Sequence, residues 1–169
     1  MKNKIIILLA LLLFISCSNI KTKEINTEKQ YEMLLNNWEL DKLGLLLKDN
    51  GNSAENRITE KYKILLQERI KEKSDLENMI EDLKSQLKSN NFENIEMYFN
   101  DSFINRKILS EMKKIDFSQM KIMSTKPEYY KNTASNIAAV IFSDNVQYFR
   151  FTYKLSNKKW SIIEIKDGR

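Results

Sequence analysis

The strongest constraint on the fold is a change in the spacing of apolar residues near Asp116. Before this point apolar residues recur every three or four positions, as in helices, and after it they alternate with polar residues, as in strands. The clearest alternation lies in residues 147–155, with Phe149, Phe151, Tyr153 and Leu155 on one side. Helices followed by strands predict an α+β fold, with N-terminal helices and then a curved antiparallel sheet of about four strands.

Four segments after Asp116 are predicted to form this sheet. Residues 120–130 contain Pro127 and suit an edge strand, because proline cannot donate to the ladder. Residues 136–143 are apolar on both sides, which predicts a central strand that is covered on both faces. Residues 147–155 and 159–166 follow after short links of turn-forming residues, so the last three strands are expected to form an antiparallel meander.

The region before the sheet is predicted to be helical, with residues 27–73 as a helical region and 74–169 as the α+β domain. A capping box begins at Thr27, and the apolar run 43–47 is expected to be buried. Residues 55–89 lack Gly and Pro, but a heptad started at Ile58 fails at Arg69 and Glu72. This predicts two helices, 55–72 and 75–89, or one helix with a change of face. Shorter helices are expected at 92–99 and 102–114.

Composition excludes several kinds of chemistry. The chain has no His and a single Cys, Cys17. Ser-His-Asp and Cys-His catalysis, imidazole or thiolate zinc sites and disulfides therefore have no candidates, and no metal or cofactor is expected. The net charge is +5, of which Lys2 and Lys4 contribute two, and charges of both signs alternate along the chain. No basic face is evident, so nucleic acid is not an expected partner.

The N-terminus has the layout of a secretory signal: Lys2 and Lys4, then eleven apolar residues over 5–15. Eleven residues are too few for a spanning helix, which needs about 20. The end of this apolar run and the two residues after it, Phe14-Ile15-Ser16-Cys17, resemble the lipobox of bacterial lipoproteins. That resemblance implies cleavage before Cys17, acyl chains such as palmitate on this cysteine, and anchoring in the cell envelope on the extracytoplasmic side. The membrane would be the outer one if two are present, with 18–26 as a tether.

The C-terminal part resembles a second family. Residues 83–93, and the closing hairpin with Lys159-Trp160-Ser161-Ile162, are similar to the nuclear transport factor two-like and cystatin-like α+β domains of small lipoproteins. The resemblance implies helices packed into the concave face of a curved sheet, often leaving a cone-shaped pocket. Some relatives are enzymes that use Asp-His or Asp-Tyr pairs, but no catalytic residue is carried over to this chain.

Three residues are candidates for a ligand site. Trp160 either lines a pocket or caps the core, and Arg150 beside Tyr148 either forms an anion site or belongs to a solvated sheet face. The favoured function is a non-catalytic binding or interaction module that holds an envelope protein or component. Alternatives are a carrier of a small apolar ligand in the concavity of the sheet, and an enzyme that uses carboxylates or Tyr.

Overall fold

The computed structural model describes residues 25–49 and 56–168, and the chain divides into two compact units, residues 1–67 and 68–169. Cys17, the predicted signal peptide and the tether up to residue 24 lie outside the described residues. Residues 25 and 26, which were assigned to the tether, are already helical. None of the described helices has the length and apolar character needed to cross a bilayer.

The first unit is built from a helix over residues 25–36, helix α2 (Leu40–Asp49) and the start of helix α3 (Asn56–Lys88). Its core contains the following buried side chains: Tyr31, Leu34, Leu35, Leu40, Leu43, Leu47, Tyr62 and Leu66. The prediction that the whole run 43–47 is buried is wrong for Leu45, which is 63% exposed. Leu43 and Leu47 lie one turn apart on the core side of α2, whereas Leu45 falls on the opposite side.

Helix α3 is continuous over 33 residues. Of the two predictions for residues 55–89, the single helix is therefore confirmed and the division into two helices is wrong. No break occurs where the heptad fails at Arg69 and Glu72, and ion pairs from Arg69 to Glu72 (2.9 Å) and from Lys71 to Asp75 (2.8 Å) bridge successive turns in this part of the helix. Its early part buries Tyr62 and Leu66 in the first unit, and its later part buries side chains from Leu76 to Leu87 in the second.

Asn90 ends α3 in a Schellman motif. Its φ is 52°, Asn91 N–H donates to Gln86 O at 2.9 Å, and Asn90 N–H donates to Leu87 O at 3.0 Å. The Asn90 side chain then holds the segment that leads to the sheet: its amide donates to Asp116 at 2.7 Å and accepts from Phe117 N–H at 3.1 Å. The helix end therefore fixes the position of the 115–120 loop.

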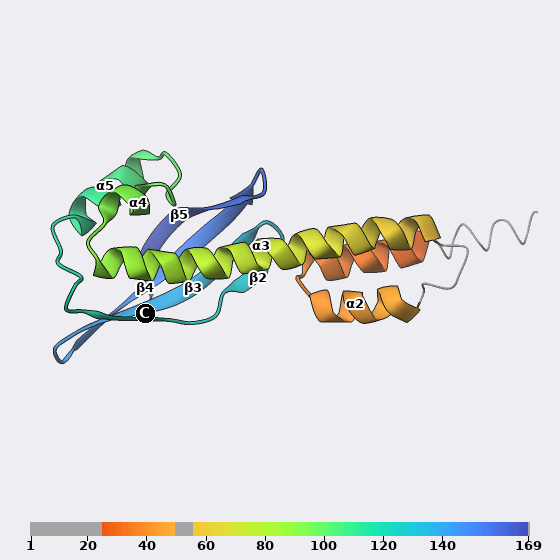
Figure 1. The fold of residues 1–169 in the computed structure, drawn as a ribbon, viewed down its shortest axis with the longest axis horizontal. Helices are drawn as coiled ribbons and strands as arrows, with labels where there is room; N and C mark the ends of the chain where they lie inside the picture. Colours follow the sequence, from red (N-terminus) through yellow and green to blue (C-terminus); the bar gives the residue numbers. More distant parts are fainter. Residues whose placement is uncertain (1–24, 50–55, 169) are drawn as a thin grey trace, which may run out of the picture. The chain divides into compact units, whose positions relative to one another are not determined.

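The second unit continues with helices α4 (Phe92–Glu96) and α5 (Phe103–Met112) and an antiparallel sheet (Figure 1). The strands are β1 (Lys121–Ser124), β2 (Glu128–Tyr130), β3 (Thr133–Phe142), β4 (Asn145–Ser156) and β5 (Lys159–Asp167). Their order is β1-β3-β4-β5, and β2 also pairs with β3. The α+β prediction and the β3-β4-β5 meander are confirmed. The predicted edge strand is divided into β1 and β2, with Pro127 in the gap.

The turn between β4 and β5 is a two-residue hairpin loop. Asn157 and Lys158 have φ values of 52° and 61°, and Ser156 pairs with Lys159. Positive φ at both central residues is the geometry of a type I′ turn, whose twist matches that of the strands. This tight turn brings β5 directly beside β4.

The two faces of the sheet differ in cover. We call the face with Ala138, Phe151 and Ile162 the inner face, because these side chains are buried beneath the helices of this unit. On the opposite, outer face, Ile137, Ala139 and Ile141 of β3 are only half-buried. The prediction that β3 is covered on both faces is therefore wrong for the outer face, where neighbouring strands shield the side chains laterally but leave their ends exposed.

Candidate functional site

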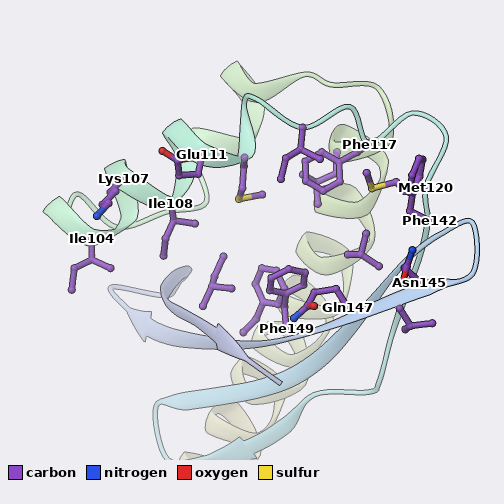
Figure 2. Close-up of a pocket in the computed structure, with 17 residues that line it drawn as sticks. Ile104, Lys107, Ile108, Glu111, Phe117, Met120, Phe142, Asn145, Gln147 and Phe149 are labelled. Atoms are coloured by element: carbon purple, nitrogen blue, oxygen red, sulfur yellow. The ribbon is translucent and has the colours of Figure 1, made fainter. Parts of the chain in front are cut away.

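An apolar cavity of about 880 Å³ lies between α5 and the inner face of the sheet (Figure 2). Its first wall is one side of α5, formed by Ile104, Ile108 and Met112. These residues are four positions apart and therefore share one helix face. Ile104 is 66% exposed, so this apolar face is not closed against the sheet. An apolar helix face that stays open in this way is available to a ligand.

The opposite wall is the inner face of the sheet, with Phe149, Phe151 and Ile165. Phe149 and Ile165 are only half-buried, whereas Phe151 is buried and stacks on Tyr153 with ring centroids 6.3 Å apart. The β3–β4 hairpin extends this wall with Phe142. The 115–120 loop, held by Asn90, borders another side with Ile115 and Phe117, and Figure 2 shows Phe117 there. The cavity therefore lies between α5, the sheet with its β3–β4 hairpin and the 115–120 loop, and it is partly open to solvent.

Few polar side chains line the cavity. Lys107 and Glu111 belong to α5, and Asn145 and Gln147 belong to the first part of β4. A hydrogen bond from Lys114 Nζ at 2.7 Å lowers the pKa of the Glu111 carboxyl below its ordinary value, and the charge of Lys107 contributes in the same direction. The charged groups of Lys107 and Glu111 are solvent-exposed, and the interior between the walls is apolar.

Asn105 positions α5 over the sheet. Its side chain is 0% exposed, and its amide nitrogen donates to Ile162 O at 3.1 Å, to Asn100 O at 3.2 Å and to the Asn100 side chain. Ser102 caps the helix by accepting from Asn105 N–H at 3.2 Å. The 98–100 segment also pairs with β5, since Ile162 N–H donates to Tyr98 O at 2.7 Å. One buried amide thus links the helix, the preceding loop and the sheet.

The three site residues predicted from the sequence do not meet at this cavity. Trp160 is buried, donates from Nε1 to Glu72 O at 2.7 Å, and packs edge-on against Tyr129. It belongs to the core between α3 and β5. Tyr148 and Arg150 lie on the outer face, opposite Ala139 and Ile137. None of the three is among the described residues that line the cavity.

The cavity residues on α5 were not predicted from the sequence, because their apolar spacing is the same as that of ordinary core residues. The spacing of Ile104, Ile108 and Met112 predicts an apolar helix face, and such faces usually close on a core.

In the segments 25–49 and 56–168, no three His, Cys, Asp or Glu side chains are grouped as metal ligands would be.

Comparisons with protein-family models, with curated proteins and with solved structures found no match to this chain. The resemblances to lipoproteins and to nuclear transport factor two-like domains therefore remain predictions from the sequence.

Proposed function

We propose that this protein is a non-catalytic binding module of the cell envelope, anchored through lipid on Cys17, and that its ligand is a small apolar molecule. The observation that carries the proposal is the cavity of about 880 Å³ with apolar walls. Ligand sites are typically clefts of roughly 300–1,000 Å³ that are lined by apolar side chains with a few polar groups. The favoured prediction from the sequence was a module that holds an envelope protein or component, and the carrier of a small apolar ligand was an alternative; this cavity supports the alternative.

The energetics of such a site follow from the area that a ligand removes from water. Burying one methylene group contributes about 0.8 kcal/mol, which is roughly fourfold in affinity. The exposed side of α5 and the half-buried Phe149 would lose their contact with water at the same time. A straight-chain alkyl ligand should therefore bind more tightly with each added methylene until the cavity is filled.

The cavity is tested by the substitution Ile108→Trp, which places a large side chain between the walls. We expect the affinity for dodecanol to fall at least about tenfold, because the indole occupies the volume that the alkyl chain needs. The measurement is displacement of a fluorescent apolar dye from residues 18–169, a chain that keeps every described residue. Thermal unfolding of the same samples shows whether the variant is folded.

The matched control is Ile64→Trp, the same change at an exposed position of α3 in the first unit. It should leave dodecanol binding unchanged. Equal binding by the wild type and a folded Ile108→Trp variant would show that the alkyl chain does not enter the cavity. Absence of binding to the wild type would refute the apolar-ligand proposal.

The anchoring proposal has a separate test in cells. Labelled palmitate should be incorporated into the wild-type protein and not into the Cys17→Ser variant, because the lipobox resemblance assigns the acyl chains to this residue. The wild type should sediment with membranes, and an unlabelled wild-type protein would rule out lipidation at this site.

A second candidate function, a protein interaction module, is favoured by the outer face of the sheet. Met123, Ala139 and Tyr148 are paired across β1, β3 and β4, so they form one row. Met123 is 50% exposed and Tyr148 is 40% exposed. Arg150 lies two residues further along β4 on the same face. The enzyme alternative has one Tyr-Asp pair among the described residues, in which Tyr98 Oη donates to the Asp82 carboxylate, but neither side chain lines the cavity.

A further inference from the structure

We infer that the ligand of the cavity is a single-chain amphiphile with an anionic head group, a long-chain carboxylate, and that Lys107 binds its head. This inference rests on the proposed function, since it specifies the class of ligand for the same cavity. Two features of this part of the chain carry it: the placement of Lys107 beside the apolar wall of α5, and the ion pairing of the neighbouring cations.

The first feature is the placement of Lys107 beside the apolar wall. It lies between Ile104 and Ile108 in the sequence, and all three residues line the cavity. Figure 2 shows the Lys107 amino group at one edge of the cavity, with Ile108 projecting toward the interior. An alkyl chain between the walls therefore ends within reach of a cation.

The second feature concerns the four cations of residues 103–114, of which Lys107 alone makes no ion pair within the described part of the chain. The segment 103–114 carries Arg106, Lys107, Lys113 and Lys114 against a single acid, Glu111. Arg106 pairs with Asp101 at 3.6 Å, Lys114 pairs with Glu111 at 2.7 Å, and Lys113 pairs with Glu96. Lys107 forms no ion pair with any residue in the described part of the chain.

These pairings decide the sign of the charge that the site favours. The negative charge of Glu111 is offset by its ion pair with Lys114. The net charge of Lys107, Glu111 and Lys114 together is therefore positive. A carboxylate head gains an ion pair with Lys107, whereas a quaternary ammonium head meets an uncompensated cation. The ion pair between the ligand carboxylate and Lys107 would be exposed to solvent, which limits the expected gain in affinity to about two- to fivefold.

The test compares tridecanoate, dodecanol and dodecyltrimethylammonium, which share one twelve-carbon alkyl chain and differ in the charge of the head group. Dissociation constants for residues 18–169 are measured below the micelle concentration of each compound. We expect tridecanoate to bind about two- to fivefold more tightly than dodecanol, and the ammonium compound to bind most weakly. The preference should shrink as salt is added, because exposed charges are screened.

The variants Lys107→Gln and Lys113→Gln separate this role from a general effect of basic charge. Lys113 lies on the same helix but does not line the cavity and is paired with Glu96. The preference for tridecanoate over dodecanol should disappear in Lys107→Gln and persist in Lys113→Gln. Equal affinities for all three compounds, or the same preference in both variants, would overturn the inference while leaving the cavity as a site for apolar ligands. Failure of all three compounds to bind would refute the proposed function as well.

Discussion

Replacing Asn105 with aspartate should lower the free energy of unfolding by about 3–5 kcal/mol at neutral pH, which is the range for an uncompensated buried charge. The two side chains have nearly the same shape, so packing is preserved. The change replaces a donating amide with a carboxylate that faces the carbonyl oxygens of Ile162 and Asn100. Chemical denaturation followed by circular dichroism measures the loss.

The effect of this substitution should depend on pH in a defined direction. Burial among oxygen acceptors raises the pKa of the introduced carboxyl in the folded state above its unfolded value of about 3.9. The folded state then binds more protons than the unfolded state, so the destabilisation is smallest below about pH 4 and grows as the pH rises. Asn94→Asp is the matched control at an exposed position and should change stability by less than about 0.5 kcal/mol. A similar loss in both variants would show that Asn105 does not hold α5 on the sheet.

Replacing Ile162 with alanine should cost about 2–5 kcal/mol, because its side chain is 0% exposed and the change leaves a cavity in the core. The same substitution at Ile163, which is only half-buried, should cost clearly less. Urea denaturation of both variants gives the two values on a common scale. The pair is matched, since the residue type, the strand and the substitution are identical.

The comparison tests the register of β5 directly. A β-bulge shifts the pairing between Thr152 and Tyr153, so that Tyr153 lies opposite Ile162 and Thr152 lies opposite Glu164. The shift leaves Ile163 as the additional residue. Equal losses at the two positions, or a larger loss for Ile163→Ala, would contradict this register.

The bulge also explains which residues of β5 share the inner face. Strict alternation after Trp160 and Ile162 would place Glu164 on the inner face. The additional residue instead places Ile165 there, opposite Phe151. Ile165 thereby becomes part of the sheet wall of the cavity. A local irregularity of the strand therefore contributes directly to the proposed site.

Several features of the fold could be predicted from the sequence because they depend on neighbouring residues alone. The alternation in residues 147–155 predicted that Phe151, Tyr153 and Leu155 face the core, and all three are buried. The absence of Gly and Pro from residues 55–89 allowed a long helix, and α3 is continuous. Short links rich in turn formers predicted the meander, since tight turns can join only antiparallel neighbours.

The candidate site could not be predicted in this way, because it depends on the distance between elements. Periodicity shows that Ile104, Ile108 and Met112 share an apolar face, but not how closely that face approaches the sheet. That separation is decided by Asn105, which links α5 to Ile162, and by Asn90, which holds the loop at Phe117. The sequence by itself determined the order and the apolar faces of the elements, because spacing along the chain sets which side chains share a face. Only the tertiary structure decided the register of β5 and the cavity, because the register depends on the bulged pairing with β4 and the cavity on contacts between elements far apart in the chain.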